Sequence, residues 1–234
     1  YLLQDHLDRF YVSAKALGIK IPMEKPELGK LLTELLAQVE GSTQFVYWQV
    51  TRGAADRNHV YDESMVGKLW VLIRPNTLND PDVAIKLNTA EDTRFYHCNI
   101  KTLNLLPSVV AAQEAKRLGV QETVFHRCET VTECAHSNVS ILKGGVFYSH
   151  PNDELILRGI SKTHMIQACY RLGITVMEKA FTLDDLRSAD EIIVTSSSNF
   201  CLHACELDGA PAGGGDPATL KAIQDEVIGE YLAY

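Results

Sequence analysis

One lysine, Lys101, stands among apolar residues in the segment Ile-Lys-Thr-Leu-Asn-Leu-Leu at positions 100–106, just before a predicted helix. A lysine that loses its surrounding water becomes a nucleophilic amine, because desolvation lowers the pKa of the ammonium group. The same side chain can instead extend its charged end from the end of a strand into solvent. The segment alone leaves both interpretations open.

Two further segments carry residue types suited to chemistry. Glu133 follows two β-branched residues at 131–132, where it is either a functional acid or a solvated turn carboxylate. Arg57 and His59 are two residues apart in a polar loop, and on an extended chain two such side chains point the same way. Arginine suits two-pronged binding of a carboxylate, but a solvated Arg-His turn has the same spacing.

A metal site was considered at the alternating residues Cys201, His203 and Cys205. These residues lie on a strand-like stretch and lack a fourth ligand. The sequence therefore predicts no metal.

Composition limits the class of protein that positions these residues. The 234 residues are 46% hydrophobic and 22% charged, as in a globular protein with one large domain or two modest ones. The net charge of -8, without a compensating basic patch, disfavours nucleic acid as a partner. The longest apolar runs are far shorter than the roughly 20 residues of a transmembrane helix, so no membrane partner is expected. Six cysteines without a Cys-x-x-Cys pair, and no signal-peptide pattern, favour a cytoplasmic location.

The first third of the chain predicts a small α/β unit. Apolar residues at helical spacing predict helices over 3–17 and 25–39, and aromatic and β-branched residues predict strands over 44–51 and 68–74. The loop between these strands carries Arg57 and His59. Prolines and Asn or Asp residues at 75–81 then indicate a connection, so we predict domains over 1–78 and 79–234.

The second part interleaves strands with a few helices. Strands are predicted at 83–87, 94–98, 122–127, 139–143, 146–148 and 191–195, and helices at 107–118, 161–172 and 182–189. Gly144-Gly145 suits a two-residue hairpin, and the Ala/Pro/Gly tract at 210–215 is interpreted as a flexible loop. This order favours an α+β fold over a doubly wound sheet.

The motifs occur as ordered blocks along essentially the whole chain. The blocks are His6-Leu7-Asp8-Arg9, Gln49-Val50-Thr51-Arg52-Gly53, Arg57-Asn58-His59, the lysine segment at 100–106, Gln113-Glu114-Ala115, Val131-Thr132-Glu133 with Ser137-Asn138, Leu155-Ile156-Leu157-Arg158-Gly159-Ile160, and residues 190–198. Together they resemble the fold-type IV aminotransferases, which use pyridoxal 5'-phosphate (PLP), and within that class the D-amino acid aminotransferases. Branched-chain enzymes of the same fold carry Gly, Asn and Tyr after the lysine, which this chain lacks.

The resemblance implies an α+β protein with a small α/β N-terminal domain and a larger barrel-like C-terminal domain. It implies that Lys101 forms an aldimine with PLP and then moves a proton between the substrate Cα and the cofactor C4'. It implies that Glu133 pairs with the pyridine nitrogen and keeps this nitrogen protonated. Both residues are therefore expected to be catalytic.

Further roles follow from the same resemblance. A phosphate needs positive charge and directed N–H or O–H donors, and a cofactor ring needs an apolar neighbour. The residues matched to the phosphate are Arg9, Gly159, Ile160, Ser161, Ser196 and Ser197, and the residue matched to the ring is Leu157.

For the substrate, the resemblance implies that Arg57 and His59 bind the α-carboxylate of a D-amino acid. The implied reaction moves an amino group between a D-amino acid such as D-alanine and a 2-oxo acid such as 2-oxoglutarate. Alternatives are an aminodeoxychorismate lyase or an amine or branched-chain transaminase of the same fold, which would not need Arg57 and His59 in this role. An inactive PLP-binding fragment is an alternative of another class.

Two departures from the family pattern and two expectations remain. Cys134 and His136 stand where many members have small residues, so local hydrogen bonds near the cofactor are expected to differ. The chain opens on Tyr1 within a predicted element, which suggests an N-terminal truncation and a small domain without its first strands. The family implies a homodimer.

Overall fold

The structure is a computed structural model that describes residues 1–41, 43–77 and 80–233. It divides into a smaller unit, residues 2–78 with 100–102, and a larger unit, residues 1, 79–99 and 103–234. The domain boundary predicted between residues 78 and 79 lies outside the described residues, so it stays a prediction.

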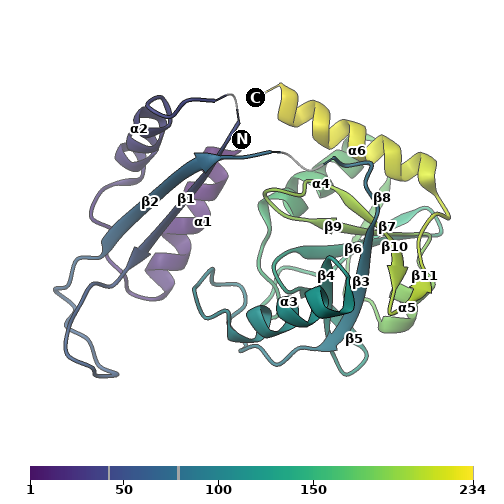
Figure 1. Ribbon diagram of the computed structural model, residues 1–234, viewed down its shortest axis with the longest axis horizontal. Helices are drawn as coiled ribbons and strands as arrows, with labels where there is room; N and C mark the ends of the chain where they lie inside the picture. Colours follow the sequence, from purple (N-terminus) through teal and green to yellow (C-terminus); the bar gives the residue numbers. More distant parts are fainter. Residues whose placement is uncertain (42, 78–79, 234) are drawn as a thin grey trace. The chain divides into compact units, whose positions relative to one another are not determined.

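The smaller unit is an antiparallel ribbon that packs one face against two helices (Figure 1). Its elements are α1 (Leu3–Ala16), α2 (Lys25–Leu36), β1 (Gln44–Thr51) and β2 (Lys68–Pro75). The strands pair along their whole length, from Gln44 with Pro75 to Thr51 with Lys68. Apolar residues of all four elements share one core, namely Leu7, Leu28 and Leu32 with the partly buried Val46, Trp48, Leu69 and Val71.

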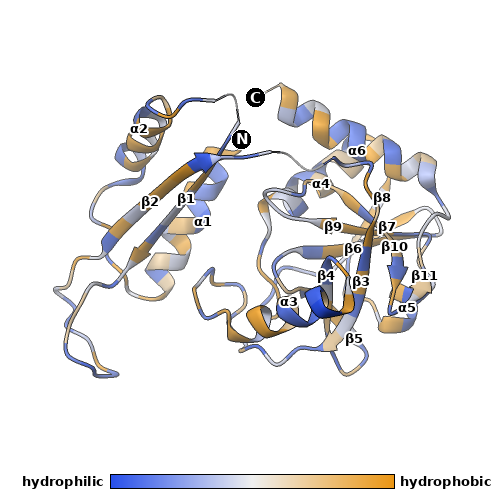
Figure 2. Ribbon diagram, viewed as in Figure 1, coloured by the Kyte–Doolittle hydropathy of each residue, from blue (hydrophilic) through white to orange (hydrophobic). Residues whose placement is uncertain are grey.

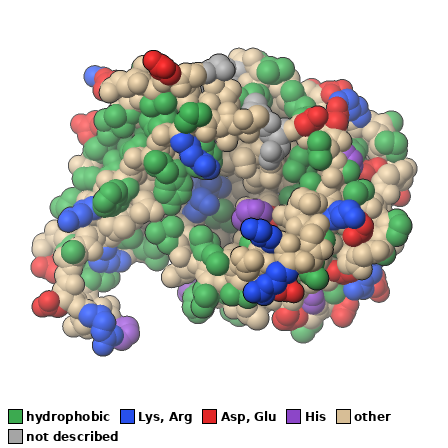
Figure 3. Space-filling view, viewed as in Figure 1, with side chains coloured by type: hydrophobic (Ala, Val, Ile, Leu, Met, Phe, Trp, Pro, Cys, Tyr) green, Lys and Arg blue, Asp and Glu red, His purple; other side chains and the backbone are tan. Residues whose placement is uncertain are grey.

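The other face of this ribbon carries large apolar side chains. Trp70, Leu72 and Tyr47 alternate with the core residues and are 62%, 57% and 37% exposed. The ribbon is strongly apolar along both strands (Figure 2), and Figure 3 shows hydrophobic side chains on the surface of this unit. Within the described part of the chain, β1 and β2 pair only with each other.

The larger unit is built on one mixed sheet of nine strands. In sheet order these are β5 (Thr130–Cys134), β4 (Glu122–Arg127), β3 (Ile85–Glu91), β10 (Leu202–Leu207), β9 (Glu191–Thr195), β6 (Asn138–Lys143), β7 (Val146–Ser149) and β8 (Thr175–Glu178), with β11 (Ala210–Pro211) beside β10. Residues from β5 and from β6, which are distant in this order, share one buried core with β3, β4, β9 and β10. The sheet is therefore curled into a half-barrel around that core.

Three helices cover the outside of the half-barrel, namely α3 (Leu106–Leu118), α4 (Ile160–Arg171) and α6 (Pro217–Leu232). The short helix α5 (Leu183–Arg187) instead packs Leu183 and Leu186 into the inner core. In β9, Ile192 and Val194 face the inner core, whereas Ile193 packs with residues of α4 and α6. Because β9 is buried on both faces, the three central residues at 192–194 are all apolar instead of alternating with polar residues. In the described ranges, no helix combines the length and the apolar character that crossing a bilayer requires.

The α+β fold predicted from the sequence is confirmed, and many elements lie where they were expected. The strands over 44–51, 122–127 and 191–195 have the predicted bounds. The helices over 3–17 and 107–118 differ by one residue at one end, and the helix over 161–172 is shifted by one residue at both ends. Gly144 and Gly145 have φ values of 59° and 73°, as the predicted two-residue hairpin requires.

The strand predicted at 94–98 is wrong. Residues 92–105 form turns and irregular backbone. The side chain of Arg94 turns inward to Asp92, and the backbone N–H of Cys98 donates to the carbonyl of Glu154 at 3.0 Å. The local bonds to Asp92, together with the long-range bond to Glu154, override the local strand propensity.

The C-terminal part was the least predictable region. Helix α6 was not predicted, although Asp216 caps it by accepting a hydrogen bond from the Thr219 N–H at 3.2 Å. Strand β8 and, earlier in the chain, strand β5 were also not predicted, whereas β10 lies on the stretch that was interpreted as strand-like. The tract interpreted as a flexible loop instead begins as β11, and its Gly214 N–H donates to Glu191 at 3.1 Å. The glycines of this tract therefore suggested a flexible loop where the backbone is held by hydrogen bonds.

Candidate active site

Glu133 is a buried carboxylate held by three donors. It lies near the end of β5 and is 5% exposed. Its Oε1 accepts a hydrogen bond from Arg94 Nη1 at 2.5 Å. Its Oε2 accepts one from Asn138 Nδ2 at 2.8 Å and one from the backbone N–H of Leu157 at 3.0 Å. The position and orientation of the carboxylate are therefore fixed.

Arg94 joins Glu133 to a second buried carboxylate, Asp92. Arg94 Nε and Nη2 each donate to an oxygen of Asp92 at 2.9 Å. Arg127 Nε donates to the same carboxylate at 3.2 Å. Two carboxylates and two guanidinium groups thus balance their charges in a region that excludes most water.

The pKa values in this cluster reflect burial and pairing together. Burial raises the pKa of Glu133 to about 7, against the charge of Arg94 and the Leu157 N–H, which lower it. Burial also raises the pKa of Asp92, but the bonds from Arg94 and the charge of Arg127 outweigh it and leave the pKa below its ordinary value. Glu133 is therefore the group of this cluster that can share a proton with a basic nitrogen near neutral pH.

Arg94 and Asn138 complete the site but were not predicted as site residues. The sequence signal for Arg94 was the Asp-x-Arg spacing of 92–94, but Arg94 was assigned to the start of the strand predicted over 94–98. Asn138 follows Ser137 in one of the family blocks, and its side-chain amide donates to both Glu133 and the carbonyl of Leu157, the latter at 2.9 Å. Partners of this kind become visible only when distant segments are brought together.

The N-terminus of α4 lies a few residues beyond Leu157. Gly159 precedes the helix, and Ile160 and Ser161 form its first turn. A Cβ atom on Gly159 would lie 1.9 Å from Oδ1 of Asn138, so only glycine allows this close approach. The first turn of a helix presents unpaired backbone N–H groups, which favour an anion.

A turn after β9 meets this helix end. Ser161 Oγ donates to the carbonyl of Ser196 at 2.9 Å, and Ser197 is exposed in the same turn. The Thr195 hydroxyl is buried and has no hydrogen-bond partner among the described residues. Thr195 is on the face of β9 that α4 covers, since it alternates with Val194. The larger unit therefore brings together the predicted residues Glu133, Leu157, Gly159, Ile160, Ser161, Ser196 and Ser197.

The remaining predicted residues belong to the smaller unit. The backbone N–H of Lys101 donates to Ser13 Oγ on α1 at 3.1 Å, and Arg9 lies one helical turn before Ser13. Arg57 and His59 are exposed on the loop between β1 and β2. Arg52 anchors this loop by donating to the carbonyls of Leu17 and Gly18 at 2.6 and 2.9 Å.

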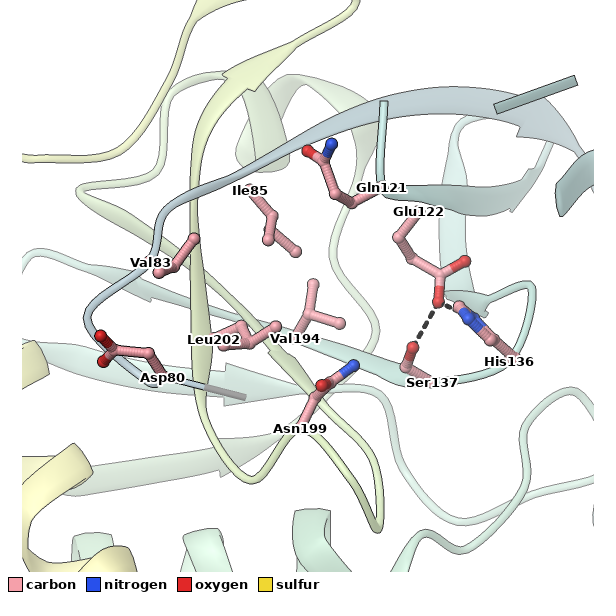
Figure 4. Close-up of a pocket in the computed structure, with 10 residues that line it drawn as sticks. All are labelled: Asp80, Val83, Ile85, Gln121, Glu122, His136, Ser137, Val194, Asn199 and Leu202. Atoms are coloured by element: carbon pink, nitrogen blue, oxygen red, sulfur yellow. Dashed lines mark hydrogen bonds and ion pairs between the residues drawn. The ribbon is translucent and has the colours of Figure 1, made fainter. Parts of the chain in front are cut away.

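Cys134 and His136, the two departures from the family pattern, have separate surroundings. Cys134 is part of the inner core. His136 lies in the wall of a cavity of about 310 Å³, where it pairs with Glu122, which also accepts a hydrogen bond from Ser137 (Figure 4). The bond to Glu122 raises the pKa of His136. The carboxylate stands between the hydroxyl and the imidazole, whereas activation of a serine needs the imidazole in the middle.

The residues of the larger unit have the chemical groups that binding of PLP requires. Glu133 offers a carboxylate to a ring nitrogen, and the first turn of α4 offers backbone N–H donors to a phosphate. The unpartnered Thr195 hydroxyl is consistent with a site that a polar ligand completes. Within 1–41, 43–77 and 80–233, no group of three His, Cys, Asp or Glu side chains is placed to hold a metal ion.

Comparison with known proteins gives consistent results. A family model for class IV aminotransferases matches residues 1–207. A D-alanine aminotransferase of Listeria monocytogenes serotype 4b is 39% identical over 231 residues, which cover 96% of this chain and 80% of the relative. A D-alanine aminotransferase of Bacillus licheniformis is 33% identical over 237 residues, 98% of this chain and 84% of the relative. The family predicted from the sequence motifs is confirmed.

Solved structures share the fold at lower identity. The branched-chain amino acid aminotransferase of Escherichia coli superposes with a TM-score of 0.88 at 21% identity, over 98% of this chain and 78% of the other. An aminotransferase from Brucella abortus bound to the cofactor PLP gives a TM-score of 0.88 at 21% identity, over 99% of this chain and 84% of the other. The fold-type IV architecture is therefore confirmed.

Replacing Arg94 by methionine is expected to lower the free energy of unfolding by about 3–5 kcal/mol, because Glu133 and Asp92 then lose a buried partner. Equilibrium unfolding in urea measures this change. The control is Arg117→Met, since Arg117 pairs with Glu114 at 3.0 Å on the surface and such a pair contributes less than about 1 kcal/mol. Adding Glu133→Gln to Arg94→Met should recover part of the loss. Equal effects of the Arg94 and Arg117 substitutions would contradict this account.

Proposed function

Because the chain belongs to the class IV aminotransferases, we propose that it transfers an amino group between a D-amino acid such as D-alanine and a 2-oxo acid such as 2-oxoglutarate, with PLP as cofactor. The observation that carries the proposal is the juxtaposition of the buried Glu133 carboxylate and the N-terminus of α4, joined through Leu157. The D-alanine aminotransferases at 33–39% identity support the reaction and the substrate class.

Glu133 and the α4 terminus would hold opposite ends of the cofactor. When bound, PLP supplies an electron sink for a carbanion at the substrate Cα. Glu133 would hold a proton at the pyridine nitrogen, supported by its pKa of about 7 and by its three fixed donors. The backbone at Gly159, Ile160 and Ser161, with Ser196 and Ser197, would bind the phosphate, together with Arg9. Leu157 would pack against the ring.

Lys101 would hold the cofactor covalently and then move a proton between the substrate Cα and the cofactor C4'. Its backbone is tied to Ser13 of α1, the helix that also carries Arg9. This shared attachment supports a common role for Lys101 and Arg9 in holding one ligand.

Arg57 and His59 would select the substrate by its α-carboxylate. Both side chains are exposed on a loop whose base is fixed by Arg52, which also lies 3.4 Å from the centre of the Tyr61 ring. An anchored loop with exposed Arg and His side chains is suited to reading a carboxylate. This arrangement supports D-amino acids as the substrate class.

We propose a homodimer that buries the apolar stripe of α3. Leu106, Val109 and Val110 recur at helical spacing on α3 and are 74%, 60% and 61% exposed. Phe95 and Tyr96, in the loop that precedes α3, are 70% and 63% exposed. The apolar first turn of α3 is visible in Figure 2. A contiguous apolar surface of this kind is typical of a protein interface, and a second copy of the chain offers the same surface in return.

We also propose that residues 1–78 and 79–234 act as two domains, as the division into two compact units supports. A cytoplasmic location is supported by the cysteines. All six are free thiols, and the reducing cytoplasm keeps thiols in this state.

Lys101→Ala should lower the rate of amino-group transfer from D-alanine by roughly 10²- to 10⁴-fold, because the proton-transfer group is removed. The measurement is a half-reaction of the PLP-loaded protein with D-alanine. Peptide mapping of the borohydride-reduced wild type should find the pyridoxyl group on Lys101. Lys30→Ala is the control, since Lys30 of α2 is solvent-exposed. A pyridoxyl group on another lysine would refute the role of Lys101.

Arg57→Ala should lower kcat/KM for D-alanine by roughly 10- to 100-fold, because a charge-assisted hydrogen bond to the carboxylate is lost. The PLP absorbance should be unchanged, and activity on amines without a carboxylate should rise relative to D-alanine. The control is Arg74→Ala, which removes an exposed arginine from β2. Equal losses on D-alanine and on simple amines would mean that Arg57 acts through the cofactor or the fold. A wild-type preference for L-leucine would exclude the D-specific assignment.

Val110→Lys should shift the protein from dimer to monomer in sedimentation analysis, because a charge is placed in the centre of the proposed interface. Leu232→Lys, on the 75% exposed Leu232 of α6, should leave the dimer intact. A monomeric wild type, or a dimer that survives Val110→Lys, would rule out this interface.

A further inference from the structure

Lys162 is a buried lysine that has no part in the proposed reaction. It occupies the third position of α4, and only 1% of its surface is exposed. Its Nζ donates to the carbonyl of His150 at 2.5 Å and to Oδ1 of Asn152 at 3.1 Å. Lysine is almost never fully buried without a compensating charge, so the burial of Lys162 needs a physical explanation.

The charge of Lys162 is not neutralised by a direct ion pair. Within the described part of the chain, both partners of Nζ are neutral oxygens. Burial lowers the pKa of Lys162 to about 8, whereas the more distant charges of Glu178, Glu133 and Asp153 favour its ammonium form and Arg158 opposes it. The Lys162 side chain, which leaves the first turn of α4, therefore carries a positive charge into the buried space between that turn and the turn at 150–152.

This charge has the same sign as the end of the helix that holds it. The N–H groups of a first helical turn already create a positive potential, so a cation there is unfavourable in the absence of an anion. The neighbouring imidazole does not supply a negative partner. Burial lowers the pKa of His150 to about 4, which keeps the ring neutral. The arrangement becomes favourable when an anion binds at the helix end.

The two hydrogen bonds of Lys162 also fix the chain path between β7 and α4. They tie the turn at 150–152 to the first turn of the helix. The segment between these two points carries the Leu155 carbonyl, which accepts from Arg94 at 3.2 Å, and the Leu157 N–H, which donates to Glu133. Lys162 therefore braces a segment that contacts the buried carboxylate at one end and begins the helix at the other.

We propose that Lys162 is a positioning residue for an anionic group bound at the N-terminus of α4, through its buried charge and through the turn that it braces. The inference rests on the proposed function, in which this anion is the phosphate of PLP. Lys162 acts through the helix end and the turn, because its ammonium group is already bonded to His150 and Asn152.

The test measures ligand binding by the cofactor-free protein. PLP, pyridoxal and inorganic phosphate are titrated into the wild type, Lys162→Met and Lys162→Arg. Lys162→Met should weaken PLP binding by roughly 10- to 100-fold and change pyridoxal binding by less than about threefold, because pyridoxal lacks the phosphate. Lys162→Arg should restore most of the PLP affinity, since it keeps the charge.

The matched control is Gln224→Met. Gln224 is 2% exposed, and its Nε2 donates to the carbonyls of Pro81 at 2.9 Å and Cys201 at 3.0 Å, so it is also a buried donor that bridges two oxygens. Its substitution should lower the Tm as Lys162→Met does, but should leave the affinities for PLP and inorganic phosphate unchanged. Equal weakening by both substitutions would show a merely structural effect and overturn the proposal.

The outcomes separate this inference from the proposed function. A wild type that binds PLP, with Lys162→Met binding it equally well, overturns the role of Lys162 and leaves the proposed function standing. A wild type that fails to bind PLP but binds inorganic phosphate in a Lys162-dependent way supports the anion role and overturns the proposed function. Binding of neither ligand overturns both.

If Lys162→Met does not fold, the wild type provides the test. Nitrogen-15 resonances of labelled lysine should show the Lys162 ammonium titrating at a higher pH when inorganic phosphate is bound, because an adjacent anion favours the charged form. A midpoint that phosphate leaves unchanged overturns the proposal.

Discussion

The larger unit depends on placing the Glu133 carboxylate where little water reaches it. Burial of a charge is costly, and the cost is offset only when partners satisfy the carboxylate oxygens. Arg94, Asn138 and the Leu157 N–H do this from three separate segments. Each partner must be positioned to within a hydrogen-bond length, so the irregular chain at 92–105, the start of β6 and the chain before α4 are all constrained by one side chain. The strand predicted at 94–98 was incompatible with this requirement, because it would carry Arg94 on regular sheet backbone.

The need of Glu133 for partners from separate segments also explains which parts of the structure the sequence could predict. Elements with strong local patterns, such as β1, β4, β9 and α4, were predicted within one residue. Hydrophobic periodicity and secondary-structure propensity can be determined from a few neighbouring residues, so they are visible in the sequence. The site residues that the sequence indicated, such as Lys101 and Glu133, came from ordered family motifs. Arg94, Asn138 and Lys162 were not identified, because each has a hydrogen-bond partner that lies 5 to 39 residues away and that no local pattern records.

The comparisons distinguish the architecture, which the fold sets, from the choice of substrate, which the fold alone does not set. A TM-score of 0.88 with a branched-chain amino acid aminotransferase at 21% identity shows that one architecture is shared with an enzyme named for another substrate. The shared half-barrel therefore does not by itself set the choice of substrate. Loops carried by a rigid scaffold often set it, and the loop between β1 and β2 is the candidate here. Its base is fixed by Arg52, and Arg57 and His59 lie exposed beyond this anchor.

The larger unit has opposite polarity at two nearby points, and this polarity sets the orientation of a ligand. Glu133 is an acceptor with a pKa of about 7, so it favours a basic nitrogen. The first turn of α4 combines the N–H groups of a helix N-terminus with the buried charge of Lys162, so it favours an anion. Asn138 connects the two points, because its amide donates to Glu133 and its Oδ1 lies against Gly159 at the start of the helix. The separation between the two points is thus fixed by a single side chain and one short stretch of backbone. A molecule with a basic ring nitrogen at one end and a phosphate at the other fits this polarity in only one end-to-end direction.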